Sequence, residues 1–154
     1  MRCHRLLLIA IALLLAAPAW AQTEGWGVRF GLSDDPNQLI VGAQYDFGEI
    51  TNNVHFEPNV ELGFGDDFTI LSATAAAHYH FKDVEKVRPY AGGGVALAFV
   101  DIDHALVDDS EFEIAVRAIG GVMWPLKHQR DFFVELNINF GDIQDAQLMA
   151  GWRF

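Results

Sequence analysis

The sequence predicts an all-β fold, an eight-stranded antiparallel up-and-down transmembrane β-barrel that follows a cleaved signal peptide. Three observations predict it. The first residues have the composition of an export signal. The remaining chain alternates apolar and polar residues in segments of roughly ten, the pattern of strands with one face in lipid and one in a lumen. Aromatic residues gather towards the strand ends, where a membrane has its headgroups.

Residues 1–21 have the three parts of a secretory signal. A basic start precedes an unbroken apolar run over residues 6–17, and Ala19, Trp20 and Ala21 put small residues at the two positions that a signal peptidase reads. The apolar run is too short to span a bilayer as a helix. We expect cleavage after Ala21, which leaves residues 22–154 as one barrel domain.

Composition narrows the choice of partners. The chain has 21 Asp and Glu against 10 Lys and Arg, for a formal net charge of −11. Removal of the signal takes away Arg2 and Arg5, so the exported chain is more acidic still. Nucleic acid is therefore not expected as a partner. The one cysteine, Cys3, lies in the signal, and no disulfide is expected.

Eight segments of alternating residues follow the signal, and polar turns separate them. Each segment places an apolar residue at nearly every second position, which gives it one apolar face. In chain order these faces run over residues 26–32, 39–47, 54–64, 71–81, 91–99, 112–124, 132–140 and 146–154. Phe68, Ile70 and Phe133 fall on the opposite faces, where they indicate bulges or a partly apolar lumen.

The polar faces separate a membrane barrel from a soluble one, since a lipocalin-like barrel or a sandwich has the same period. Arg29, Glu61, Arg117 and Glu135 lie in mid-strand among other polar residues. If these residues faced solvent, the apolar faces would have to fill the interior. Eight strands enclose too little space for so many aromatic rings. We therefore expect the apolar faces to point outwards into lipid.

The aromatic residues form two belts if the strands run up and down. The belt at the end where the chain starts is expected to contain Trp26, Tyr45, Phe47, Tyr79, Phe81, Trp124, Phe132, Trp152 and Phe154. The belt at the opposite end is expected to contain Phe30, Phe64, Phe99, Phe112 and Phe140.

The connections at the two ends differ in charge. Those at the starting end are mixed or basic, whereas those at the far end, around residues 33–38, 65–67, 101–110 and 141–145, carry aspartates and no Lys or Arg. Exported barrels keep short turns in the periplasm, which assigns the aspartates to the cell exterior. Only residues 101–110 form a loop of any length. The aspartates form a solvated acidic rim or bind divalent cations, which accept carboxylate oxygens.

The charged residues on the inner faces predict an ion-pair network, because charge buried without a partner is costly. Its expected members are Arg29, Glu57, Glu61, Glu113, Arg117, Glu135 and Arg153. Side chains just fill an eight-stranded lumen, so we expect a filled interior. A narrow channel for small or apolar solutes is the alternative.

Three histidines lie near the starting end. A tight hairpin that pairs Gly65 with Phe68 would set His55 opposite His78, with His80 nearby and Glu57 diagonal to them. The favoured interpretation is polar filling of the lumen, with no metal and no cofactor. A zinc or copper site is the alternative, because imidazole and carboxylate are ligands for both metals.

Catalytic residues are not evident, and we predict that the protein is not an enzyme. Barrels that modify lipid acyl chains use a serine beside a histidine. Ser33 and Ser110 lie in expected loops, and Ser72 has no adjacent histidine. Asp103, His104 and Ser110 could be drawn as a triad, but nothing in the sequence sets its geometry.

The signal that ends in Ala-Trp-Ala, the stretch RPYAGGGVALAFV from Arg88 to Val100 and the last strand LMAGWRF carry a resemblance. Over all of residues 22–154 the chain resembles the small bacterial outer-membrane barrels of the OmpX, OmpW and opacity-like type. The resemblance implies location in the bacterial outer membrane, contact with its lipid and lipopolysaccharide, and a structural or interaction role in the envelope. A narrow channel is the second hypothesis, and a lipid A-modifying enzyme is the third.

The end of the chain resembles the signal that the barrel assembly machinery recognises in its clients, a terminal Phe preceded by apolar residues at alternate positions. The expected signal residues are Leu148, Ala150, Trp152 and Phe154. The resemblance therefore implies the assembly machinery as a partner during biogenesis.

Overall fold

The computed structural model describes residues 25–34, 37–65, 68–104, 107–127, 130–141 and 146–154. The expected signal peptide, residues 1–21, lies outside this part of the chain. Among the described residues, no helix is long and apolar enough to cross a membrane.

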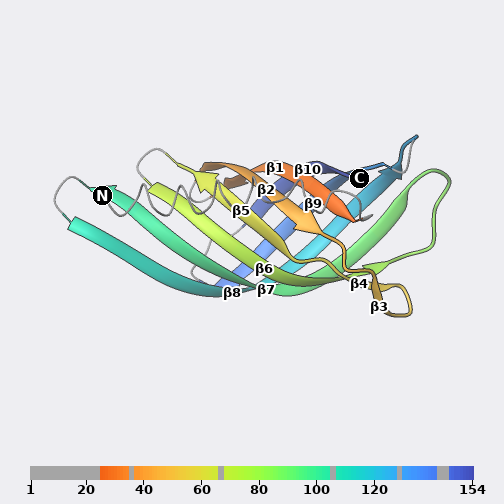
Figure 1. The fold of residues 1–154 in the computed structure, drawn as a ribbon, viewed down its shortest axis with the longest axis horizontal. Helices are drawn as coiled ribbons and strands as arrows, with labels where there is room; N and C mark the ends of the chain where they lie inside the picture. The colour runs from red at the N-terminus through yellow and green to blue at the C-terminus, as the bar shows by residue number, and fades with distance from the viewer. Residues whose placement is uncertain (1–24, 35–36, 66–67, 105–106, 128–129, 142–145) are drawn as a thin grey trace.

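The described strands form one antiparallel sheet that closes into a barrel of eight, as the sequence predicted (Figure 1). The pairing of β6 with β7 closes the sheet, and β1 pairs with β10, so the first and last strands meet at one seam. The strands are β1 (Trp26–Asp34), β2 (Gln38–Tyr45), β3 (Glu49–Thr51), β4 (Val54–Phe56), β5 (Asn59–Phe64), β6 (Phe68–His80), β7 (Arg88–His104), β8 (Val107–Pro125), β9 (Asp131–Gly141) and β10 (Ala146–Arg153).

Two walls of the barrel are interrupted, which is why ten strands make a barrel of eight. The chain continues from β2 into β3, and from β4 into β5. Backbone hydrogen bonds cross the break, from Tyr45 N to Pro58 O (3.1 Å) and from Phe47 N to Phe56 O (2.9 Å). Gly48 has φ +89° at this point, a conformation that glycine adopts without strain. The short β3–β4 hairpin projects from that end of the barrel (Figure 1).

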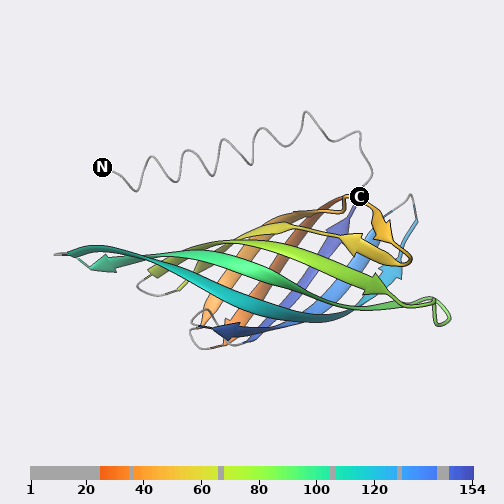
Figure 2. The same cartoon turned by 90° about the horizontal axis from the view of Figure 1, so that it is seen from below.

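The third connection at the far end differs from the sequence prediction. Residues 101–110 were expected to be a loop, but Asp101 pairs with Ser110, and His104 pairs with Val107. Strands β7 and β8 therefore continue as a hairpin that projects beyond the other hairpins at this end (Figure 2). Ile102 and Val107, one on each strand, are β-branched residues, which favour strands. Because β7 and β8 are already paired up to Val100, their backbone hydrogen bonding continues in the same register to His104.

The exterior of the barrel is apolar along the strands. Large side chains on the outward faces are widely exposed, including Leu32, Val116 and Leu136. The buried set is largely polar and charged and faces the lumen. This distribution is the reverse of that in a soluble protein, and a hydrocarbon surround accounts for it because lipid removes the penalty for exposed apolar surface.

Aromatic rings contact one another around the end of the barrel where Gly25 and Phe154 lie side by side, which we call the terminal end. Trp26 packs against Tyr45 (ring centroids 6.2 Å apart) and Phe132 against Trp152 (5.5 Å). One expected position is wrong. Phe30 was assigned to the opposite belt, but its ring lies 5.6 Å from that of Trp152, because the strands tilt and β1 meets β10 with Val28 opposite Trp152.

The lumen is partly apolar. This was one of the two interpretations of Phe68, Ile70 and Phe133, and bulges were the other. Ile70 packs with Ala96 and Ala98, and Phe133 lies in a second cluster with Tyr90. The register of β6 is continuous from Phe68 onwards, without a bulge. These residues therefore fill the lumen from regular strands.

Tyr90 occupies space that a glycine leaves free. A Cβ atom on Gly121 would lie 2.4 Å from Cζ of Tyr90, whereas a Cβ atom on Gly120 would meet nothing within 4 Å. The Tyr90 ring cannot move away cheaply, because it stacks on His78 and is 4% exposed.

We predict that Gly121→Ala lowers the free energy of unfolding by about 1–3 kcal/mol, the typical cost of overpacking. Gly120→Ala is the matched control and should leave stability unchanged. Urea unfolding in lipid vesicles measures both. Equal stability of the two variants would show that Tyr90 is free to move.

Candidate functional site

Arg29 lies at the centre of the lumen and joins three strands. It projects from β1, and its Nε lies 3.0 Å from Glu61 Oε1 on β5. Its Nη2 donates to Glu135 Oε1 on β9 at 2.5 Å, and its Nη1 donates to Gln44 on β2 at 3.2 Å. The side chains of Arg29, Glu61 and Glu135 are each 1% exposed. The guanidinium group therefore spans the lumen between opposite walls.

Glu61 carries the network on to β8. Its second oxygen, Oε2, accepts a hydrogen bond from Arg117 Nη1 at 3.1 Å, and Arg117 Nε donates to Asn139 on β9 at 2.8 Å. One carboxylate is thus shared by two guanidinium groups. With Glu135 the layer holds two positive and two negative side chains, so its formal charge is balanced. Balance of this kind is what buried charge requires.

Tyr90 connects this central layer to the histidines. Its hydroxyl donates to Glu135 Oε2 at 2.9 Å, and its ring stacks on His78 with centroids 5.3 Å apart. Tyr90 was not among the residues expected in the network. The sequence does contain a signal for it: Tyr90 is two residues before Gly92, which was expected on the lumen face, so both residues share that face of β7.

A second cluster lies nearer the terminal end, around Glu57 at the junction of β4 and β5. Glu57 Oε1 lies 3.1 Å from His80 Nε2 and 3.4 Å from Arg153 Nη1. Glu57 Oε2 lies 3.4 Å from His78 Nδ1. Glu57 and His78 are each 2% exposed, so this carboxylate is buried among its partners.

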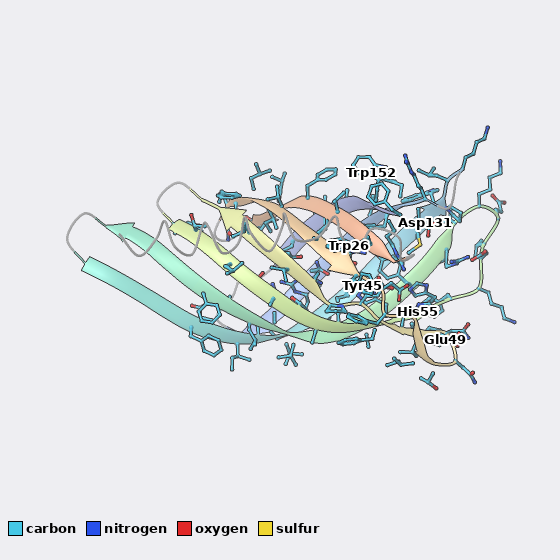
Figure 3. All side chains as sticks on the ribbon, viewed as in Figure 1. Trp26, Tyr45, Glu49, His55, Asp131 and Trp152 are labelled. Carbon is cyan, nitrogen blue, oxygen red and sulfur yellow. The ribbon has the colours of Figure 1, made fainter. Side chains whose placement is uncertain are left out.

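Asp46 completes this cluster. It follows β2 at the break, and its Oδ2 lies 3.0 Å from His55 Nδ1. The same carboxylate pairs with Arg153, which holds Glu57 with its other nitrogen. The His55 ring stacks on His80, with centroids 4.4 Å apart and an angle of 10°. We call Asp46, His55, Glu57, His80 and Arg153 the mouth cluster; Figure 3 shows His55 beside the start of the β3–β4 hairpin.

The residues expected in the ion-pair network fall into these two groups. Arg29, Glu61, Arg117 and Glu135 make the central layer, whereas Glu57 and Arg153 belong to the mouth cluster. Glu113 is half-buried on the lumen face of β8, four positions nearer the far end than Arg117. The register sets His55 opposite His78. Asp46 was missed as a partner because the break that presents it has no clear sequence signal.

The terminal strand β10 seals the barrel. Phe154 N donates to Trp26 O at 2.7 Å, and Gly25 N donates to Phe154 O at 3.1 Å. Leu148, Trp152 and Phe154 expose between 39% and 57% of their surface on the exterior, and Ala150 lies between them on the same face. The four residues expected as an assembly signal thus form one apolar stripe at the seam.

An exposed ion pair offers a contrast with the buried ones. In the turn between β6 and β7, Arg88 Nε donates to Asp83 Oδ1 at 2.7 Å, and the two side chains are 36% and 53% exposed. The hydrogen bond from Arg88 lowers the pKa of the Asp83 carboxyl. Water screens such a pair, so its contribution to stability is small.

Solved structures with the same architecture are small barrels. Neisserial surface protein A (NspA) superposes with a TM-score of 0.67 at 17% identity, over 83% of this chain and 92% of that one. The N-terminal barrel domain of Pseudomonas aeruginosa OprF gives 0.68 at 12% identity, over 84% and 96%. The fold is that of the small outer-membrane barrels. No family model matches the chain, and no curated protein matches it.

An enzyme shares this architecture. The outer membrane enzyme PagL superposes with a TM-score of 0.51 at 11% identity, over 82% of this chain and 95% of that one. In this chain Ser72 donates to Glu61 at 3.4 Å inside the lumen. The side chains of Asp103, His104 and Ser110 lie outside the described part of the structure. The described residues give no positive sign of catalysis.

We predict that Glu61→Gln lowers the free energy of unfolding by about 3–5 kcal/mol, because it leaves Arg117 without its carboxylate partner in a buried site. Asp83→Asn, which breaks the exposed pair, should leave the unfolding midpoint unchanged. Urea unfolding in vesicles compares the two variants with the wild type. Equal small effects would mean that water reaches the central layer and screens it.

Proposed function

We propose that this protein is an integral barrel of the bacterial outer membrane, with a lumen that its own side chains close and a structural or interaction role in the envelope. The apolar exterior and the aromatic belt support the location, since a hydrocarbon layer with headgroup boundaries matches both. The architecture shared with other small outer-membrane barrels agrees with it.

The proposal of a closed lumen rests on the very low solvent exposure of the charged side chains in the central layer. Arg29, Glu61, Arg117 and Glu135 come from β1, β5, β8 and β9, and each side chain is at most 1% exposed. A continuous water path through this level would wet at least some of these groups. The paired charges hold the side chains in place, because separation would leave charge unpaired at low dielectric.

Partners follow from the exterior. The apolar band contacts the acyl chains of outer-membrane lipid, and the far end is expected to meet lipopolysaccharide. Divalent cations remain a proposal for the acidic hairpins at that end. Of the aspartates expected there, Asp34 is described and exposed. The side chains of the others lie outside the described part of the chain.

The seam suggests how the barrel assembly machinery would recognise the chain. Leu148, Ala150, Trp152 and Phe154 present one apolar stripe along β10, the strand whose edge pairs with β1 only when the barrel closes. Before closure this strand has a free edge, which another strand can pair with.

We predict no steady conductance for the purified protein in planar bilayers. The double variant Glu61→Ala/Arg117→Ala should conduct, because it removes both ion pairs of Glu61 and leaves Arg29 paired with Glu135. Asp83→Asn/Arg88→Gln, which removes the exposed pair, is the control and should stay silent. Steady wild-type conductance would instead support a narrow channel. A silent Glu61→Ala/Arg117→Ala variant would mean that other side chains close the lumen.

We also predict that Phe154→Ala lowers the amount of folded barrel in the outer membrane several-fold. The substitution keeps both backbone hydrogen bonds at the seam, so the unfolding midpoint of refolded protein should change little. Phe47→Ala is the control, since Phe47 is 64% exposed at the same end but lies outside β10. Quantitative blotting of membrane fractions measures the levels. Normal levels of Phe154→Ala would leave this residue a lipid-facing role alone.

A further inference from the structure

We propose that the mouth cluster binds one zinc ion through His55, Glu57 and His80. Each of these residues offers one ligand atom, and the three atoms lie within 4.8 Å of one another. Two imidazoles and one carboxylate form a ligand set that zinc takes in proteins, with a fourth position left for water. The inference does not depend on whether the lumen conducts, because the cluster lies outside the central layer.

Strand geometry brings the three residues together. His55 and Glu57 are two residues apart on one wall, and His80 comes from β6, which pairs with β4. Side chains two apart on a strand share a face, and diagonal neighbours across a ladder are within reach of long side chains. All three ligands therefore sit on backbone that the sheet holds.

Each donor has a partner that orients it. Asp46 lies 3.0 Å from His55 Nδ1, which leaves Nε2 of that ring for a metal. A carboxylate behind a ligating imidazole is the usual support of a zinc site, since it sets the tautomer and makes the ring a better donor. Glu57 Oε2 is 3.4 Å from His78 Nδ1, so Oε1 is the oxygen that faces His80.

The charge of the cluster favours a cation. Asp46 and Glu57 supply two negative charges, and Arg153 supplies one positive charge between them. The carboxylates of the cluster therefore outnumber its guanidinium groups by one, in a mostly buried place. A divalent cation held by His55, Glu57 and His80 would offset this excess of negative charge.

Access and fit also agree with a metal site. The His55 side chain is 24% exposed at the terminal end, while Glu57 is 2% exposed, so an ion can enter past the histidine and meet the carboxylate behind it. Tetrahedral zinc with bonds of about 2.0–2.2 Å places its ligand atoms roughly 3.4 Å apart. Glu57 Oε1 and His80 Nε2 already lie 3.1 Å apart, so only the longer separations, of at most 4.8 Å, must shorten, by about an ångström. The stacked rings of His55 and His80 must also tilt until their lone pairs converge.

The test is calorimetric titration of the full barrel, purified in detergent without a histidine tag, with zinc chloride. Millimolar calcium in the buffer competes with zinc for carboxylates outside the mouth cluster. We expect one zinc per barrel with a dissociation constant in the micromolar range or below. His55→Asn and His80→Asn should each weaken binding more than tenfold, and Asp46→Asn about tenfold, as for partners that support a ligand.

Two variants serve as controls. Tyr90→Phe disturbs the neighbouring lumen without removing a ligand, and His104→Asn removes a histidine at the opposite end of the barrel. Both should bind zinc as the wild type does. The proposal would be overturned if the dissociation constant for zinc were above 100 µM, which corresponds to a binding free energy of about −5.5 kcal/mol. Unchanged binding by His55→Asn and His80→Asn would overturn it too.

X-ray absorption at the zinc edge keeps the proposal testable on wild-type protein, even if a variant does not fold. The spectrum should contain scattering from two imidazoles and only nitrogen or oxygen in the first coordination sphere. A spectrum of oxygen ligands alone would place the zinc on surface carboxylates and would contradict the site.

Discussion

The carboxylate that Arg29 and Arg117 share, that of Glu61, sets the arrangement of the rest of the barrel. Its two oxygens contact guanidinium groups from β1 and β8, strands that are not neighbours in the sheet. Loss of any one partner would leave the layer with one uncompensated buried charge, at a cost of several kcal/mol. The strands must therefore meet at heights that bring these groups together. The stagger at which the barrel closes must therefore be one that also pairs the charges of the lumen.

Close packing in the lumen follows from that constraint. Long arginine and glutamate side chains cross the interior, so neighbouring positions must be small. Ala96 and Ala98 on β7 are fully buried, and Gly121 leaves the space that the Tyr90 ring fills. Tyr90 in turn donates to Glu135, which ties the aromatic packing to the charges. The exterior is not constrained in this way, because lipid accepts apolar side chains of many sizes.

The mouth cluster differs from the central layer in both charge and access. The central layer is balanced and dry, whereas the mouth combines two carboxylates with one arginine, and His55 is partly exposed. The break between β2 and β3 produces this difference, since it turns Asp46 towards His55 and Arg153. A closed centre agrees with the proposal of a lumen without a channel. An incompletely neutralised mouth suits the binding of a cation.

The sequence by itself determined which side chains face lipid and which face the lumen, because alternation along a strand assigns faces without reference to any partner. It offered the register of β5 with β6 only on the condition that Gly65 pairs with Phe68, and the structure meets that condition. It misplaced residues 101–110, where the strand continues, and it gave no sign of the break beside Asp46.

Only the tertiary structure decided which charges pair. Arg29 and Glu135 are 106 positions apart, and Arg153 and Asp46 are 107 apart. Alternation places each of them in the lumen but says nothing of its height. Height depends on how far successive strands are staggered when the sheet closes. That stagger is a property of the whole barrel, so no local stretch of sequence could specify the network.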